Sequence, residues 1–168
     1  MSIEILNESG VVPSVVPEQE LHDLARYVLD QLQVHRFAEL AISLVDESAM
    51  EALHLQWMDL PGPADVMSFP MDELRPGGDD FSSPEGVLGD VVLCPEVARR
   101  QAAQAGHSVA DEMLLLTTHG ILHLLGFDHA DPKGEHEMFD LQRTLLLTYL
   151  AQRGRTTTAA PNPRPDAG

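Results

Sequence analysis

The sequence predicts a mixed α+β domain, with a mixed sheet of about four strands packed by about five helices, one of which lies at the centre of the domain. Three observations predict it. Short apolar segments alternate with longer segments of helical periodicity. Pro70 lies within one apolar segment and cannot donate to a sheet ladder, so that strand belongs at a sheet edge. Residues 114–127 are apolar on most sides, which is typical of a helix buried at the centre of a domain.

The first elements are a strand, a helix and a strand. Residues 4–6 indicate the first strand. Pro17, with two glutamates close behind it, is typical of the first turn of a helix, which we expect to run to about Gln33. Apolar residues that alternate with smaller ones over 40–44 predict the second strand.

Asp46 is a suitable N-cap for a second helix, expected to end near Trp57. The third strand is predicted over 65–71. Residues 72–86 are rich in Gly, Pro, Asp and Ser, so we expect a long loop, either a binding loop or a disordered one.

A strongly apolar fourth strand is predicted over 87–93, with Asp90 in its interior. Because a buried acid needs a partner, Asp90 is expected to have one. Pro95 is suited to start the next helix and Gly106 to end it, with Arg99 and Arg100 on its solvated face.

Ser108 and Asp111 have the spacing of a capping box and predict the start of the central helix. Asp131 and Pro132 start the last helix, whose apolar residues recur at helical spacing on one face: Met138, Leu141, Leu145 and Tyr149. Residues 1–153 are therefore expected to form one domain, and residues 154–168 a disordered tail.

The charge of the chain limits its partners. The formal net charge is −17, from 27 acidic and 10 basic side chains. A protein that binds nucleic acid by general attraction to phosphates carries a basic face, which this chain lacks, so DNA is not an expected partner. Most of the acids are expected on solvated faces that maintain solubility.

The chain is expected to be cytoplasmic and independent of membranes. The lone Cys94 excludes an internal disulfide and favours a reducing compartment. The first residues lack the basic and apolar regions of a secretory signal, and residues 114–127 are too short and too rich in histidine to span a bilayer.

The histidines His119, His123 and His129 surround Gly126 in one short segment. Residues four apart lie on the same face of a helix, so the first two can present imidazoles to one ion. Gly126 tolerates the left-handed conformation that commonly ends a helix, and such a turn lets His129 supply a third nitrogen. A single buried histidine is usually a satisfied core residue. Three around this glycine predict one bound zinc ion instead.

Three neutral nitrogens and an open fourth position are the donor set of a catalytic zinc, which lowers the pKa of bound water toward neutrality. A structural zinc normally has four protein ligands. That alternative stays open, because another side chain could complete the site: His136, His107, His54, Asp128 or Cys94. None has a recognised spacing, which favours catalysis.

The histidine spacing also matches that of metzincin proteases, whose helix carries His-Glu-x-x-His-x-x-Gly-x-x-His. In those enzymes the glutamate after the first histidine is the general base, and here that position is Gly120. Asp128 is either a substitute base or a partner that orients an imidazole. A metallopeptidase therefore remains an alternative that lacks its usual base.

Residues 119–129, together with 65–70 and 88–90, resemble the YbeY family of bacterial endoribonucleases, also called ribosomal RNA maturation factors. The resemblance extends over about residues 3–150. It implies a single zincin-like domain, one zinc ion held by the three histidines, and metal-dependent cleavage of single-stranded RNA. It also implies a role in processing the 3′ end of the small-subunit ribosomal RNA and in ribosome quality control.

One position departs from the family pattern. The family often carries an arginine before the segment 65–70, where this chain has Met58. The resemblance implies that this arginine holds or polarises the phosphate, so Arg99, Arg100 and Arg75 are candidate substitutes. Together with the acidity of the chain, this predicts weak affinity for free RNA and delivery of the substrate by the ribosome or a partner.

Three functional hypotheses follow. The first is a zinc-dependent endoribonuclease that acts on ribosomal RNA. The second is a metallopeptidase, supported by the ligand spacing and by an edge strand able to pair with a peptide. The third is a non-enzymatic ribosome assembly factor in which zinc contributes only stability. The sequence does not assign a catalytic base or an oligomeric state.

Overall fold

The computed structural model describes residues 2–11, 17–128 and 130–154. Its strands are β1 (Ser2–Asn7), β2 (Glu39–Leu44), β3 (Val66–Pro70) and β4 (Val87–Leu93). Its helices are α1 (Glu18–Gln31), α2 (Glu47–Met58), α3 (Pro95–Ala105), α4 (Val109–Leu124) and α5 (Pro132–Ala151). The predicted mixed α+β fold is confirmed. The predicted tail beyond Gly154 lies outside the described residues.

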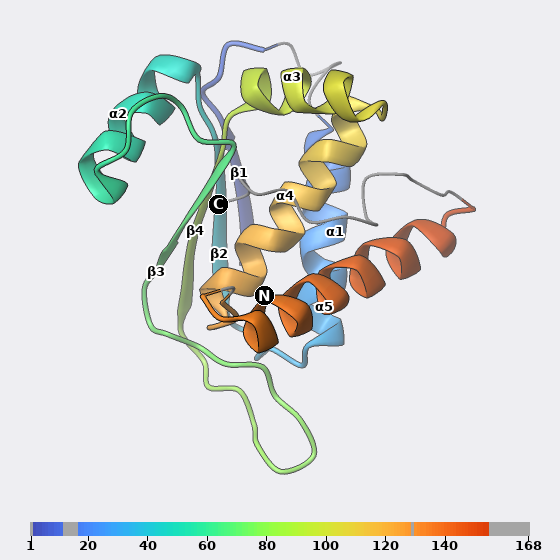
Figure 1. The fold of residues 1–168 in the computed structure, drawn as a ribbon. Helices are drawn as coiled ribbons and strands as arrows, with labels where there is room; N and C mark the ends of the chain where they lie inside the picture. Colours follow the sequence, from blue (N-terminus) through green and yellow to red (C-terminus); the bar gives the residue numbers. More distant parts are fainter. Residues whose placement is uncertain (1, 12–16, 129, 155–168) are drawn as a thin grey trace.

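The four strands form one sheet in the order β1-β2-β4-β3. Neighbouring strands β1, β2 and β4 are parallel, whereas β3 runs antiparallel to β4. Figure 1 shows β3 at the edge of the sheet. The edge position that Pro70 predicts for this strand is therefore confirmed.

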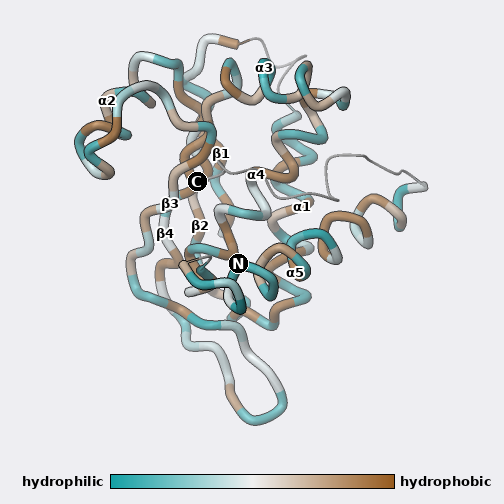
Figure 2. Tube along the Cα trace, in the orientation of Figure 1, coloured by the Kyte–Doolittle hydropathy of each residue, from teal (hydrophilic) through white to brown (hydrophobic). Residues whose placement is uncertain are grey.

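The two faces of the sheet are covered unequally. Figure 1 shows α1, α4 and α5 on one side and α2 on the other. The main core lies under the three helices and includes residues of β1, β2 and β4. A smaller apolar cluster lies on the other face, where Met50 of α2 meets Met67 and Val92. In Figure 2 the hydrophobic residues gather along the strands, and the loop after β3 is mostly hydrophilic.

Local capping signals place the helices as predicted. Asp46, Ser108 and Asp131 are the N-caps of α2, α4 and α5, and each side chain accepts a hydrogen bond from a backbone amide in the first turn. Pro17 is the residue before α1 rather than part of its first turn, and α1 ends two residues earlier than expected. Gly106 ends α3 with a positive φ of 79°.

The structure corrects the prediction for Asp90. This side chain is exposed, not buried. The register between β2 and β4 shifts at residues 39 and 40, where Leu40 pairs with Gly89 and leaves Leu88 as an extra residue. Beyond this bulge Val91 lies in the main core, so the neighbouring Asp90 points to the opposite face of the sheet. That face is covered only around Met67 and Val92, and Asp90 reaches solvent.

The long loop over 72–86 is anchored at several points. Leu74 is buried. The amide of Gly77 donates to the carbonyl of Leu32 at 3.0 Å, and Val87 donates its amide to the Asp72 carboxylate at 2.6 Å. These contacts give the loop a defined path, although it has no regular secondary structure.

Helix α4 is the centre of the domain and packs against β3, β4, α1, α3 and α5. Most of its residues are buried, as predicted. Two buried threonines in it satisfy their hydroxyls locally, since Thr117 and Thr118 donate to the carbonyls four residues earlier at 2.7 and 2.9 Å. None of the helices in the described ranges is both long enough and apolar enough to cross a membrane.

At Gly120, α4 lies directly on the sheet. A Cβ atom at this position would lie 2.7 Å from Cγ1 of Val91 and 3.2 Å from Oγ of Ser68. The Ser68 hydroxyl donates to the Gly120 carbonyl at 2.9 Å. The position therefore has no room for any side chain, and its glycine sets the distance between the helix and β3 and β4.

We expect Gly120→Ala to lower stability. Overpacking against the stiff, buried Val91 costs about 1–3 kcal/mol, and the better helix propensity of alanine offsets about 1 kcal/mol of this. Urea unfolding should show a net loss of about 1 kcal/mol. Gly78→Ala is the matched control because a Cβ there meets nothing within 4 Å. Equal free energies of unfolding for Gly120→Ala and Gly78→Ala would contradict the close approach of α4 to the sheet.

The only cysteine, Cys94, is buried before α3. Burial raises the pKa of its thiol, although the amides of Val97 and Glu96 act in the opposite direction. A raised pKa leaves less thiolate at any given pH, so at pH 8 the native protein should react with a thiol reagent far more slowly than a free cysteine does. Full reaction is expected in urea. Rapid labelling of the native protein at one thiol per chain would show that Cys94 is accessible.

Candidate metal centre

Two of the three predicted ligands meet on one face of α4. His119 and His123 lie one helical turn apart, and their Nε2 atoms are 3.1 Å from each other. The imidazole of His119 is almost completely buried, at 1% exposure. His123 is half-buried and borders a cleft. The prediction that these two side chains converge is confirmed.

The tautomer of His119 is set by α5. Its Nδ1 lies 2.8 Å from the side-chain oxygen Oε1 of the buried Gln142. An amide oxygen only accepts hydrogen bonds, so Nδ1 carries the proton and Nε2 keeps its lone pair. The ring of Phe139 stacks on His119 with 5.9 Å between centroids and 16° between planes. Sequence reasoning missed Gln142, which carries no motif of its own.

This arrangement fits a zinc ion. Two nitrogens bound to one tetrahedral zinc, each about 2.0–2.1 Å from the ion, are about 3.3 Å apart. The Nε2 atoms of His119 and His123 are already at 3.1 Å. Metal-binding histidines usually donate their other ring proton to a fixed acceptor, which is what His119 does with Gln142.

The third predicted ligand, His129, lies outside the described residues. Within the ranges that the structure describes, three or more His, Cys, Asp or Glu side chains do not gather at any single point suited to a metal. His129 as a zinc ligand therefore stays a prediction.

The turn after α4 has the geometry that Gly126 predicts. This glycine has a φ of 94°. Its amide donates to the carbonyl of His123 at 3.1 Å, and the Phe127 amide donates to Leu122 at 3.0 Å. These two bonds form a Schellman motif, which satisfies the last carbonyls of the helix and reverses the chain. The residues that follow are thus directed back from the end of α4.

The other candidates for a fourth ligand are scattered. His107 contacts Glu112 at 2.5 Å. Glu112 is in the first turn of α4, about 10 Å along the helix axis from His119. Cys94 belongs to the small cluster on the other face of the sheet. His136 and Asp128 are exposed. His54 and His123 line the same cleft.

That cleft has a volume of about 580 Å³ and lies between α2, β3 and α4. Its lining includes His54, Trp57, Met58, Phe69 and His123. Nδ1 of His54 lies 2.9 Å from the carbonyl of Gly62, so this nitrogen carries the proton and Nε2 is an acceptor. None of the residues that line the cleft is Lys or Arg.

A buried polar network lies beside the cleft. Asp65, at the start of β3, accepts a hydrogen bond from the amide of Val66 at 2.7 Å. With its NH₂ group turned toward the carboxylates, Gln101 donates to both Asp65 and Glu112, each at 3.1 Å. The network ties β3 to α3 and α4, and so fixes one wall of the cleft.

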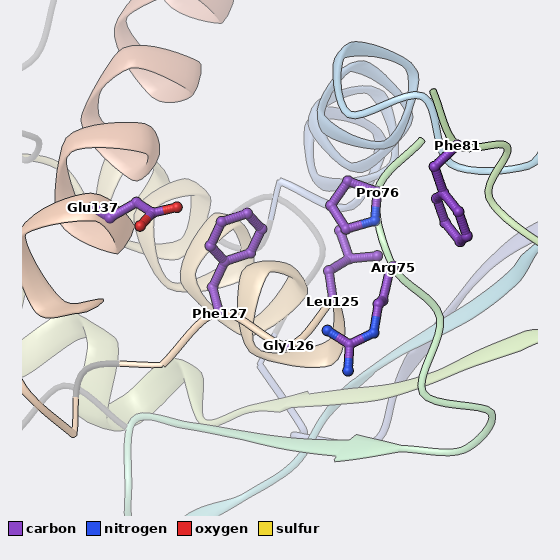
Figure 3. A pocket seen from close by; sticks show the side chains of 7 residues that line it. All are labelled: Arg75, Pro76, Phe81, Leu125, Gly126, Phe127 and Glu137. Carbon is purple, nitrogen blue, oxygen red and sulfur yellow. The ribbon is translucent and has the colours of Figure 1, made fainter. Parts of the chain in front are cut away.

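Only one of the three substitute arginines lies near the histidines. Arg99 and Arg100 are on the exposed side of α3, paired with Glu96 and Glu47. The loop after β3 instead brings Arg75 to the C-terminal end of α4, where its NH1 lies 3.8 Å from the place of a Cβ on Gly126. Figure 3 shows this guanidinium below Leu125 and Gly126, in a hollow of about 420 Å³.

A sequence profile described as "Endoribonuclease YbeY" matches residues 5–150. The chain belongs to the YbeY family. It is 69% identical over 153 residues to the endoribonuclease YbeY of Beutenbergia cavernae, which covers 91% of this chain and all of that protein. It is 62% identical over 156 residues to that of Clavibacter sepedonicus, with 92% of this chain and all of the relative covered. The resemblance stated from the histidine segment is therefore confirmed.

The fold also matches a solved structure. A protein of Thermotoga maritima, determined in solution, superposes with a TM-score of 0.58 over 95% of this chain and 99% of its own. The two sequences are 21% identical, so this likeness concerns the fold alone.

We expect the purified YbeY-family chain to bind one zinc ion, with binding lost in His119→Ala, His123→Ala and His129→Ala. Each change removes one nitrogen from a three-nitrogen site. Metal analysis and the rise in melting temperature on zinc addition measure this. His136→Ala, an exposed histidine of α5, is the matched control and should bind zinc normally. Normal zinc binding by His129→Ala would exclude that residue as the third ligand.

Proposed function

We propose that this chain is a zinc-dependent endoribonuclease of the cytoplasm that cleaves single-stranded RNA. Its substrate is ribosomal RNA on the ribosome, processed at the 3′ end of the small-subunit RNA and during ribosome quality control. The convergence of the Nε2 atoms of His119 and His123, the second of which lines a cleft, carries this proposal. Membership of an endoribonuclease family supports it.

The chain's own residues have distinct roles in the proposed reaction. His119, His123 and His129 would hold the ion, which supplies a Lewis acid for a phosphodiester oxygen and for water. Gln142 keeps the Nδ1 proton of His119 in place, so that Nε2 faces the ion. The half-buried position of His123 joins the site to the cleft through which RNA enters.

Arg75 is the candidate for binding the phosphate, in place of the family arginine that Met58 replaces. It is exposed near the turn that follows His123. Arg99 and Arg100 are engaged with glutamates elsewhere. A guanidinium forms two parallel hydrogen bonds with a phosphate, which suits the negative charge that develops on the phosphorus oxygens.

The alternatives are less well supported. An edge strand, β3, borders the cleft and would suit a peptide substrate. However, the position of the protease's glutamate is Gly120 in this chain, and Val91 of the sheet occupies the space that a side chain there would need. A peptidase would therefore need its base from another element. A non-enzymatic assembly factor would bind zinc but show no turnover.

We expect the zinc-loaded chain to cut single-stranded RNA, and the chelator-treated chain to leave it intact until zinc is restored. His119→Ala should lose cleavage at every zinc concentration, with its fold retained by circular dichroism. A gel assay on a labelled oligoribonucleotide measures this. Cleavage by the metal-free protein, or by His119→Ala at the wild-type rate, would refute the proposal. Unfolding of the chain when zinc is removed, with no RNA cleavage when zinc is bound, would favour the assembly factor.

Arg75→Ala should reduce kcat/KM for RNA by roughly tenfold or more, because a charge-assisted hydrogen bond contributes about 1.5–3 kcal/mol. Arg75→Lys should recover part of the loss, since it restores the charge without the planar fork. Arg99→Ala is the matched control and should cleave normally, because it removes an equal charge from the exposed face of α3. Equal rates for Arg75→Ala and Arg99→Ala would exclude Arg75 from phosphate binding.

A further inference from the structure

The cleft beside His123 carries an exposed aromatic ring. Trp57, near the end of α2, is 60% exposed. It contacts Phe69 of β3 edge to face, with 5.7 Å between ring centroids and 71° between ring planes. This contact restrains the indole against the edge strand while most of it faces solvent. A fixed and exposed aromatic ring at a cleft is suited to stacking with a flat ligand.

The charges of the cleft favour stacking over phosphate binding. Its lining contains no Lys or Arg, and Asp65 places a carboxylate in its wall. The whole chain carries a net charge of −17. Attraction to the phosphate backbone therefore cannot supply the affinity in this cleft. The remaining surface that recognises a nucleotide is the face of its base, which every base offers and which an indole binds well.

We propose that Trp57 is a stacking platform for an unpaired nucleobase next to the phosphodiester that is cut. The inference rests on the proposed function and adds the basis of single-strand selection. Bases in a duplex already stack on both faces, whereas an unpaired base can leave its neighbours and stack on Trp57. Because the same cleft is lined by His123, a base held there places its adjoining phosphate toward the paired histidines.

Trp57 also supplies the measurement, because it is the only tryptophan of the chain. Titration of the full chain with a single-stranded RNA octamer should quench its fluorescence. The duplex of the same sequence, and a ribose-phosphate chain without bases, should leave it nearly unchanged. Gel analysis after the titration establishes whether the RNA is intact. Quenching of Trp57 by intact RNA supports the stacking platform, even if the chain does not cleave that RNA. Cleavage without quenching overturns the stacking platform but leaves the proposed endoribonuclease function standing.

Substitutions test the affinity. By anisotropy of end-labelled RNA, Trp57→Ala should weaken binding by roughly 5- to 150-fold, while Trp57→Phe retains most of the affinity. Phe37→Ala, which removes an aromatic side chain of similar exposure (55%), is the matched control and should bind normally. Raising salt from 50 to 200 mM should change the wild-type Kd by only a few fold, since few counterions are released.

Three further outcomes overturn the proposal. The first is wild-type affinity of Trp57→Ala for single-stranded RNA. The second is equal binding of single-stranded and duplex RNA by the wild-type chain. The third is quenching of Trp57 by an extended apolar peptide but not by RNA, which would assign the cleft and its edge strand to a protein partner.

Discussion

The close contact between α4 and the sheet at Gly120 is the constraint on which the rest of the site depends. With no side chain between them, the helix backbone lies on Val91, and the Ser68 hydroxyl bonds to the Gly120 carbonyl. This contact fixes both the distance and the rotation of α4. Because successive residues of a helix point in different directions, fixing Gly120 toward the sheet also fixes the direction of His119 and His123. The geometry of the two histidines is thus set by backbone packing.

Two elements beyond α4 complete this arrangement. The Schellman turn at Gly126 satisfies the last carbonyls of the helix and reverses the chain, so that α5 can pack against α4. From α5, Gln142 and Phe139 bind and cover the imidazole of His119. Gln142, which is 23 positions away in the sequence, therefore determines which ring nitrogen of the buried His119 carries the proton. The site is a property of the packed domain and not of the histidine motif alone.

The sequence predicted those features that depend on neighbouring residues. Asp46, Ser108 and Asp131 act within their own first turns, so the helix starts could be placed. The pairing of His119 with His123 follows from helix geometry in the same way. Features that depend on tertiary packing were missed. The exposure of Asp90 follows from a β-bulge and from one-sided helix cover, and the position of Arg75 depends on the path of an irregular loop, which periodicity does not describe.

A strand edge that is open to a substrate is equally open to a second copy of the chain, which is the usual starting point of aggregation. The edge strand β3 has only five residues and ends at Pro70. Trp57 also packs against Phe69 on this strand. Two copies of the chain that approach each other at this edge repel one another, because each carries a net charge of −17. The acidity of the chain thus helps to protect an open sheet edge from self-association.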